Sequence, residues 1–435
     1  MRAPSVRSSA FGVVFLASAV IGLSGAPGNL PDMDGVPTAE PETVGMSSER
    51  LERLDSVMQG YVDRNEVAGV VTLVARRGKV VHFSVRGQRD VENGAPMNHD
   101  AIFRIASMTK PVASVALMML YEEGHFQLRD PISTWLPEFA DMQVAIPAPP
   151  QERILTRYKL IPAARPITVQ HVLTHTAGLA NTYRGLTQTD FQDMAAQREA
   201  DDTVGDMLKQ LAELPLNFHP GDAWEYGRGT DVVGRLVEVM SGQTLDEFLR
   251  QRIFEPLDMP DTHFYLPTAK LDRFAALYGP NDDGTIILTE APTADSSYVK
   301  GPHVYFSGAS GLVSTARDYW RFQQMMLNGG ELDGVRLLSR KTVELMTTNH
   351  TGDLGIWLTG PGYGFGLGYA VVTDLGPSGT PRSEGSYYWL GAFGTIFWVD
   401  PVEELVGIML TQIRPYTHLR IRQDIATMTY QAVID

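Results

Sequence analysis

The strand-like segments of this sequence lie towards its two ends, with a helical stretch between them. Residues 69–75 and 79–85 are rich in β-branched and apolar residues and flank the turn 76–78, a pattern that predicts a hairpin. Strand patterns return only late in the chain, at residues 363–372, 387–399 and 405–412. The section from about 128 to 264 shows helical periodicity and proline-containing loops. One antiparallel sheet can therefore combine the early hairpin with the late strands.

Two helices are expected beside this sheet, at residues 48–62 and at the closing segment 417–433. The pattern predicts an α/β (α+β) fold, in which an antiparallel sheet flanked by helices carries an inserted, mostly helical lobe. A chain of 435 residues is too long for one ordinary core. We expect residues 42–105 and 305–435 to form the α/β sandwich lobe and 106–304 the helical lobe, with the functional site at their interface.

The N-terminus has the pattern of an export signal. Arg2 and Arg7 precede an apolar stretch over residues 10–23, which is shorter than the roughly 20 residues of a spanning helix. Small residues follow and provide a cleavage site, so residues 1–26 are interpreted as a signal peptide and 27–41 as a linker. A cleaved signal predicts a periplasmic or secreted protein without stable membrane insertion. An uncleaved anchor is the alternative.

The net charge and the absence of cysteine argue against several kinds of binding partner and catalytic group. The net charge of −15 argues against nucleic acids and anionic membranes as partners, but leaves a small-molecule substrate open. The absence of cysteine removes disulfides, thiolate nucleophiles and cysteine metal sites. His171 and His175 have helical spacing but no third ligand. We therefore expect no metal and no organic cofactor.

The strongest chemical signal is Ser107 followed three residues later by Lys110. Residues three apart share a helix face, so the Lys110 amine can reach the Ser107 hydroxyl and activate it as a nucleophile. Pro111 is tolerated only in the first turn of a helix, and the apolar run 112–121 predicts that this helix is buried. Ser107 then stands at a helix start, where free N–H groups favour an oxyanion. The alternative is an N-cap serine with a surface lysine.

The same spacing recurs at residues 297–300, where Gly301 and Pro302 follow. Gly-Pro favours a loop, so we expect this second copy to be a surface loop without catalytic function. No serine has the G-x-S-x-G spacing, which excludes the nucleophile elbow of α/β-hydrolases.

Tyr226 lies in a glycine-flanked loop before an amphipathic helix at 231–242. A tyrosine with cationic neighbours can have a lowered pKa and can transfer a proton. An aromatic residue that merely staples the loop is the alternative.

Trp389, Gly391 and Ala392 lie at the start of the apolar segment that continues to residue 401. Glycine inside a strand often marks close approach of a ligand to the backbone. The N–H of Ala392 could therefore join that of Ser107 as an oxyanion-binding pair. A core strand with glycines for tight packing is the alternative.

The Ser107–Lys110 motif, the Tyr226 loop and the Trp389–Gly391 segment follow one another along the chain in the order of a known superfamily. In this they resemble the class C β-lactamases and penicillin-binding proteins, and most of all the family VIII carboxylesterases. Four sequence segments also match this superfamily: FRIASMTKP at residues 103–111, LTHTAGL at 173–179, SGLVST at 310–315 and FWVDP at 397–401. The resemblance covers roughly residues 45–430. It implies a β-lactamase/transpeptidase-like fold, Ser107 as the nucleophile, Lys110 as its base and Tyr226 as the proton shuttle. It also implies a buried, hydrogen-bonded role for His175.

Two positions depart from the class C lactamase pattern. Arg228 stands where those enzymes have asparagine, and Trp389 stands where they have lysine or histidine. In class C lactamases, the asparagine and the lysine or histidine hold the amide and the carboxylate of a β-lactam. Here Arg228 would instead place a cation near the mouth of the site, and Trp389 would form an apolar wall. The resemblance thus implies an exported serine hydrolase that cleaves small carboxylic esters through an acyl-enzyme on Ser107. A β-lactamase or D-alanyl-D-alanine carboxypeptidase stays open, as does a penicillin-recognising sensor that remains acylated.

Overall fold

The computed structural model describes residue 30 and residues 35–149 and 157–435. The predicted signal peptide, residues 1–26, lies outside the described residues. Among the described ones, no helix is both long and apolar enough to cross a membrane.

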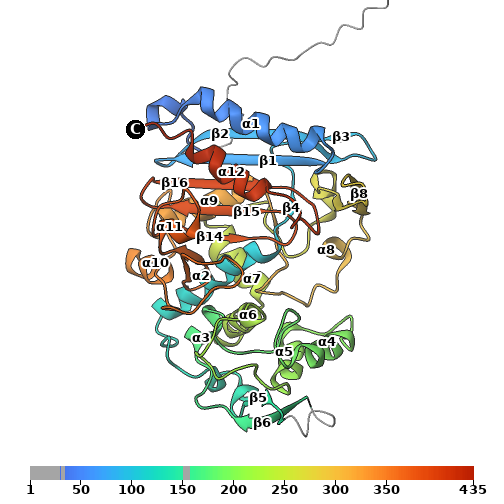
Figure 1. Cartoon of the computed structure of the whole chain (residues 1–435), viewed down its shortest axis with the longest axis vertical. Coiled ribbons are helices and arrows are strands. Elements are labelled where there is room, and N and C mark those ends of the chain that lie inside the picture. The colour runs from blue at the N-terminus through green and yellow to red at the C-terminus, as the bar shows by residue number, and fades with distance from the viewer. Residues whose placement is uncertain (1–29, 31–34, 150–156) are drawn as a thin grey trace, which may run out of the picture.

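One eight-stranded antiparallel sheet joins the two ends of the chain (Figure 1). In sheet order its strands are β12 (Tyr363–Phe365), β13 (Ala370–Val372), β14 (Tyr387–Leu390), β15 (Ile396–Asp400), β16 (Leu405–Leu410), β1 (Gly69–Arg76), β2 (Lys79–Asp90) and β3 (Ala95–Pro96). The early hairpin is confirmed, and the register of β1 with β16 places Val71 opposite Leu410. The predicted α/β class is therefore the observed one.

The segment 387–399 is a hairpin, where the sequence predicted one continuous strand. β14 and β15 pair from Tyr387 with Val399 to Leu390 with Ile396, and a tight turn separates them. Gly394 has φ +91° in this turn, a conformation that residues with a Cβ rarely adopt. The apolar pattern is continuous because both strands are buried, so it did not reveal the reversal.

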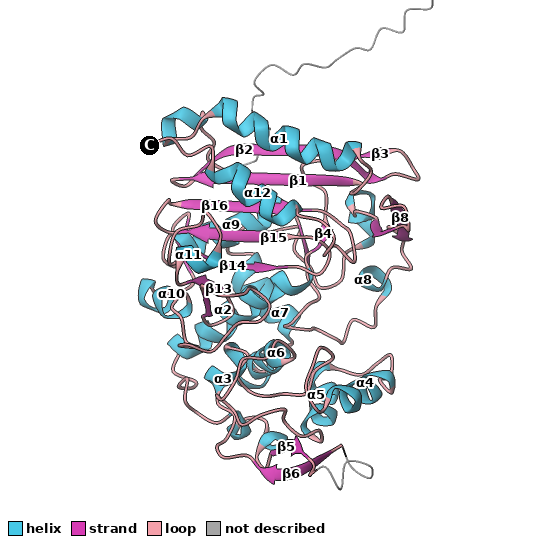
Figure 2. Cartoon of the chain, viewed as in Figure 1, coloured by secondary structure: helices cyan, strands magenta, loops and turns pink. Residues whose placement is uncertain are grey.

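Helices cover both faces of the sheet (Figure 2). α1 (Ser48–Asp63) and α12 (Ile421–Tyr430) pack together on one face, while α9 (Ala316–Leu327) lies behind β16 and β1. α1 matches the predicted helix and begins after Ser47, whose side chain accepts the N–H of Arg50 as an N-cap. α12 is shorter than the predicted 417–433 segment.

The mostly helical lobe lies on the side of the sheet that carries β14 and β13, below these strands in Figure 2. Its helices are α3 (Val169–Leu173), α4 (Gln188–Ala196), α5 (Val204–Ala212), α6 (Gly229–Ser241) and α7 (Leu245–Leu249). The remaining helices are α2 (Thr109–Glu122), α8 (Ser297–Lys300), α10 (Arg340–Met346) and α11 (Leu375–Ser378). The small strand pairs are β4 (Phe103–Arg104) with β9 (Val313–Ser314), β5 (Gln143–Pro147) with β6 (Tyr158–Pro162), β7 (Leu277–Pro280) with β8 (Ile286–Glu290), and β10 (Glu331–Leu332) with β11 (Val335–Arg336).

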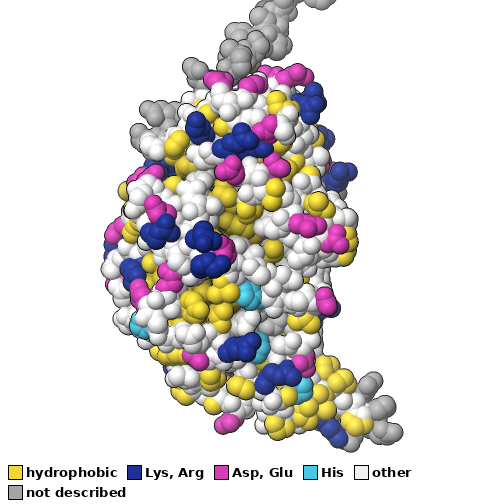
Figure 3. Space-filling model, turned by 90° about the vertical axis from the view of Figure 1, so that its left-hand side faces the viewer, with side chains coloured by type: hydrophobic (Ala, Val, Ile, Leu, Met, Phe, Trp, Pro, Cys, Tyr) yellow, Lys and Arg dark blue, Asp and Glu magenta, His cyan; other side chains and the backbone are white. Residues whose placement is uncertain are grey.

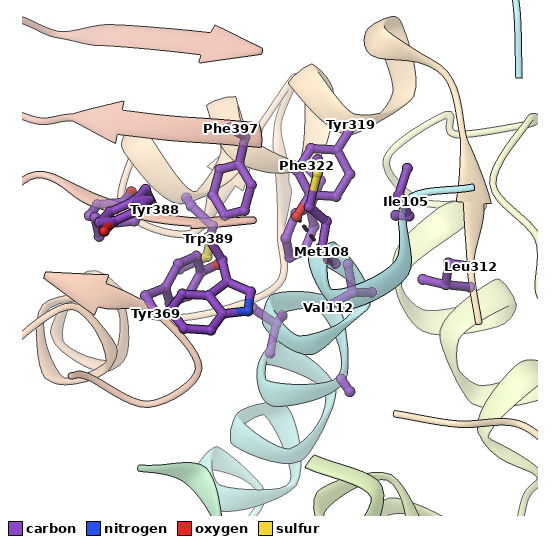
Figure 4. Packing of buried hydrophobic residues seen from close by; sticks show 14 of the residues in the cluster. Ile105, Met108, Val112, Leu312, Tyr319, Phe322, Tyr369, Tyr388, Trp389 and Phe397 are labelled. Carbon is purple, nitrogen blue, oxygen red and sulfur yellow. Dashed lines mark hydrogen bonds between the residues drawn. The ribbon is translucent and has the colours of Figure 1, made fainter. Parts of the chain in front are cut away.

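Helix α2 runs through the middle of the molecule and is buried on almost every side. Met108 and Val112 pack near Trp389 of β14 and Phe397 of β15, and Tyr319 of α9 closes the cluster (Figure 4). The Tyr319 hydroxyl donates to the carbonyl of Met108 at 2.9 Å. The first turn of α2 is therefore fixed from both the sheet and α9.

The second serine–lysine copy is a single helical turn, α8, and not the loop that the sequence predicted. Val299 is buried there and Ser296 caps the turn, so local packing and the cap outweigh the Gly-Pro that follows. Ser297 and Lys300 are exposed, and the Lys300 amine pairs with Asp295 at 3.0 Å. The surface position of this copy is confirmed.

Charges of both signs are interspersed on one face of the molecule. On the face shown in Figure 3, lysine and arginine side chains lie among aspartate and glutamate, without a large region of one sign.

Candidate active site

Ser107 lies in a 3-10 turn, Ala106–Met108, immediately before α2. Pro111 falls in the first helical turn, as its missing N–H requires. Ala106 has φ +43°, a left-handed conformation that is costly for alanine and turns the chain sharply before Ser107. The serine hydroxyl therefore stands at a strained strand-to-helix junction.

Lys110 points from the first turn of α2 back to Ser107. Its Nζ lies 3.1 Å from the Ser107 Oγ and donates to the carbonyl of Ala309 at 2.6 Å. The side chain is buried, and this burial lowers the pKa of Lys110 to about 7. The charge of Asp231 opposes the shift, and that of Arg228 adds to it. A substantial fraction of Lys110 is thus neutral near pH 7 and able to accept a proton.

Tyr226 covers Lys110 from the loop before α6. The Lys110 amine lies 4.6 Å from the centre of the Tyr226 ring, and the Tyr226 hydroxyl interacts with that of Ser107. The indole Nε1 of Trp389 donates to the Tyr226 oxygen at 3.3 Å. Burial raises the pKa of Tyr226 to about 12, so the prediction of a lowered pKa is wrong. Desolvation of the phenolate outweighs these hydrogen bonds, and Tyr226 keeps its proton.

His175 lies beneath Tyr226 in a cluster of aromatic rings. Its ring centre is 5.0 Å from that of Tyr226, and the rings of Trp224 and Phe365 also contact it. Burial of His175 is as expected, and its backbone carbonyl accepts the N–H of Glu225 at 2.9 Å, but neither ring nitrogen has a hydrogen-bond partner among the described residues. Burial and the nearby Lys110 hold the pKa of His175 well below its usual range, because aromatic neighbours cannot solvate an imidazolium.

The β14–β15 turn approaches the Ser107 turn closely. A Cβ on Gly391 would lie 2.5 Å from the carbonyl oxygen of Ile105 and 2.0 Å from Thr395 Oγ1, so only glycine fits. The Gly391 N–H is used inside the turn, where it donates to the carbonyl of Thr395 at 2.9 Å. The N–H groups of Ser107 and Ala392 have no acceptor within the described part of the chain. Two N–H donors without an acceptor therefore belong to residues that line one cavity.

A cavity of about 660 Å³ opens beside Ser107. Its lining includes Ser107, Tyr226, Trp389, Gly391, Ala392, Tyr183, Leu358 and the arginines Arg382, Arg414 and Arg422. Arg228 does not line it. The Arg228 guanidinium instead pairs with Asp231 at 3.2 Å, because the fully buried carboxylate needs a counter-charge. The predicted place of Arg228 at the mouth of the site is therefore wrong.

A second, polar cavity of about 510 Å³ lies between α3 and the loop of residues 350–354. His171 and His350 are among its lining residues, but His171 Nδ1 accepts the N–H of Thr168 in a helix cap. In residues 35–149 and 157–435, no group of three or more histidine or acidic side chains could hold a metal ion.

Three residues that contact the site were not predicted from the sequence. The Ala309 carbonyl binds Lys110, Asp231 accepts from Ser307 and from the Ala309 N–H, and Arg422 contacts the Gly391 carbonyl. A signal existed for Arg422: it is an arginine on the apolar face of the last predicted helix, where Ile421 and Ile425 also lie.

The arrangement contains the groups that acyl transfer through a serine requires: a hydroxyl, a buried amine at hydrogen-bond distance, a neutral phenol and two N–H donors without an acceptor. The sequence matches the Beta-lactamase family over residues 54–428, and the chain belongs to that family. It is an enzyme of the β-lactamase-like serine hydrolase class.

Individual relatives cover most of the chain. It is 37% identical over 371 residues to Protein Rv1367c of Mycobacterium tuberculosis, covering 81% of this chain and 88% of that protein. It is 31% identical over 381 residues to Esterase EstB of Burkholderia gladioli, covering 82% and 89%. Among solved structures, EstCE1, a hydrolase with promiscuous acyltransferase activity, superposes with a TM-score of 0.73 at 26% identity and covers 88% of this chain and 98% of its own.

Proposed function

We propose that this enzyme cleaves small carboxylic esters through an acyl-enzyme on Ser107. The observation that carries the proposal is the cluster of Ser107, Lys110 and Tyr226, in which the Lys110 amine lies 3.1 Å from the nucleophile and has a pKa of about 7. The similarity to Esterase EstB supports esters as substrates.

In the acylation step, Ser107 Oγ bonds to the ester carbonyl carbon and its proton passes to neutral Lys110. The carbonyl electrons move onto oxygen, where the N–H groups of Ser107 and Ala392 receive the charge. The C–O bond to the alcohol then breaks. The alcohol leaves with the proton from Lys110, relayed through the Tyr226 hydroxyl, which gives one proton and takes another. In deacylation, water gives a proton to Lys110 through the Tyr226 hydroxyl and its oxygen bonds to the acyl carbon. The bond from that carbon to Ser107 Oγ then breaks, Oγ takes the proton back from Lys110, and the carboxylic acid leaves.

The cavity favours an ester over a β-lactam. Trp389 presents an indole where a lactamase has a cation, and Arg228 is engaged with Asp231. The asparagine and the lysine or histidine with which a lactamase orients the amide and the carboxylate of a β-lactam are therefore absent from these two positions, whereas a short neutral ester needs only the Ser107 machinery. We also propose export, from the sequence pattern of residues 1–26.

The test is a substrate panel. We expect kcat/KM for 4-nitrophenyl butyrate to exceed that for benzylpenicillin or a cephalosporin by at least about 100-fold, or about 2.7 kcal/mol in transition-state free energy. Ser107→Ala should remove both activities, whereas Ser297→Ala should leave them unchanged. Equal turnover of the ester and the β-lactam would instead assign a lactamase, and one product equivalent per site would assign a sensor.

A further inference from the structure

A buried arginine from the last helix contacts the turn beside the nucleophile. The Arg422 side chain lies on the core side of α12 and is only 8% exposed. Its Nη2 donates to the carbonyl of Gly391, and its Nε donates to the carbonyl of Gly394 at 3.4 Å. The ring of Tyr416 lies 3.6 Å from the guanidinium carbon. Arg422 thus binds both ends of the β14–β15 turn.

The carbonyl that Arg422 contacts belongs to the same peptide group as the N–H of Ala392. A trans peptide is planar, so its C=O and N–H point in opposite directions. A hydrogen bond donated to the oxygen polarises the group and makes its N–H a stronger donor, and a charged donor does so more than a neutral one. The guanidinium therefore acts on this N–H without touching the substrate carbonyl.

The charge of Arg422 is not consumed by a carboxylate. No aspartate or glutamate is present among the residues that line the cavity, and no ion pair joins Arg422 to a described acidic residue. Burial lowers the pKa of Arg422, but a guanidinium keeps its proton in a protein. Its charge is thus offset by the carbonyl dipoles of Gly391 and Gly394 and by the face of Tyr416, and the Gly391 peptide receives a charged donor.

We propose that Arg422 is a positioning residue that aligns and polarises the Gly391–Ala392 peptide for binding of the oxyanion. The inference rests on the proposed acyl-enzyme mechanism. When Ser107 Oγ bonds to the carbonyl carbon, the carbonyl oxygen gains a full charge, and the Ala392 N–H then faces that charge while Arg422 holds the opposite end of the peptide. Because the charge exists only in the transition state and the intermediate, Arg422 contributes to kcat and little to KM.

The experiment compares Arg422→Gln with Arg420→Gln, an exposed arginine next to α12 that pairs with Asp424 at 3.5 Å. With 4-nitrophenyl butyrate, we expect Arg422→Gln to lower kcat about 10- to 100-fold, somewhat less than loss of a direct oxyanion donor, and to change KM less than about 3-fold. Arg420→Gln should match the parent enzyme. An alkyl boronic acid, which forms an anionic tetrahedral adduct with the serine, should bind Arg422→Gln more weakly by a similar factor.

The readouts separate this role from two others. A rise in KM with unchanged kcat would make Arg422 a substrate-binding residue, and unchanged kinetics would remove it from the reaction; either result overturns the proposal. If circular dichroism shows that Arg422→Gln does not fold, Arg422→Lys is measured instead, because lysine keeps one charged donor. A reduced kcat with an unchanged KM in Arg422→Lys supports the proposal, and a kcat equal to that of the parent enzyme overturns it. If the boronic acid fails to inhibit the parent enzyme, the Ser107 mechanism itself fails first.

Discussion

At the scale of single residues, Lys110 decides when the site can react. Below its pKa of about 7 the amine carries a proton and cannot accept that of Ser107. We therefore expect kcat/KM for an ester to fall about tenfold per pH unit below pH 7 and to level off above it. Lys110→Arg should be nearly inactive at every pH, because a guanidinium does not deprotonate. Steady-state rates between pH 5 and 9 measure both effects.

Glu225 provides the control for this pH profile. Burial raises the pKa of this carboxyl to about 7, and it immediately precedes Tyr226, so it titrates in the same range as Lys110. Glu225→Gln should keep the acid limb at the same pH if Lys110 is the responsible group. If the decrease of kcat/KM below pH 7 disappeared in Glu225→Gln, the Glu225 carboxyl and not Lys110 would cause the pH dependence.

The pairing of Tyr226 with Trp389 gives a second prediction at this scale. Tyr226→Phe removes the hydroxyl that relays the proton, and we expect kcat to fall about 100-fold or more. Trp389→Phe keeps an aromatic ring but removes the N–H that donates to the Tyr226 oxygen. The loss of one such hydrogen bond corresponds to about a fivefold decrease in kcat. Parallel kcat measurements on the two variants check this order, and a larger effect for Trp389→Phe would contradict the relay role of Tyr226.

At the scale of elements, the β14–β15 turn and the Ser107 turn fit together through Gly391. Gly391→Ala would place a Cβ 2.5 Å from the Ile105 carbonyl, so one of the two turns must move. We expect a loss of esterase activity of at least about tenfold and a destabilisation of about 1–3 kcal/mol. Gly355→Ala is the matched control, because a Cβ there meets nothing within 4 Å. Urea unfolding and ester turnover of both variants test the pair.

An element could be predicted from the sequence where the interactions that form it are local in the chain. Helix α2 and the position of Ser107 follow from local signals, namely the spacing to Lys110 and the placement of Pro111. The hairpin at 387–399 does not, because burial of both strands hides the turn. The Lys110–Ala309 and Arg422–Gly391 contacts join segments far apart in the chain, so a local pattern can indicate that Arg422 is buried but not which group it contacts. The sign of the Tyr226 pKa shift likewise depends on burial by distant residues.

At the scale of the whole molecule, Arg104 ties the nucleophile segment to several parts of the chain. Its side chain is fully buried, with Nη2 2.7 Å from Glu290 Oε1 and Nη1 donating to the Ala275 carbonyl at 2.8 Å. We expect Arg104→Ala to lower the free energy of unfolding by about 3–5 kcal/mol, because buried partners lose their counterpart. Arg64→Ala breaks an exposed pair with Glu66 and should cost less than about 1 kcal/mol. Urea denaturation measures both, and equal effects would contradict the anchoring role.

The pairing of β1 with β16 has a consequence for how the protein is made. β1 is synthesised together with one neighbour in the sheet, β2, but its other neighbour, β16, is translated much later. Until then the edge of Gly69–Arg76 that faces β16 has no partner, and contacts between such distant segments form slowly. The turn that carries Ala392 also arrives late, so a nascent chain holds Ser107 and Lys110 long before it holds a complete site. We therefore expect a nascent chain that ends before β14 to lack esterase activity, because the Ala392 N–H is still missing from the site.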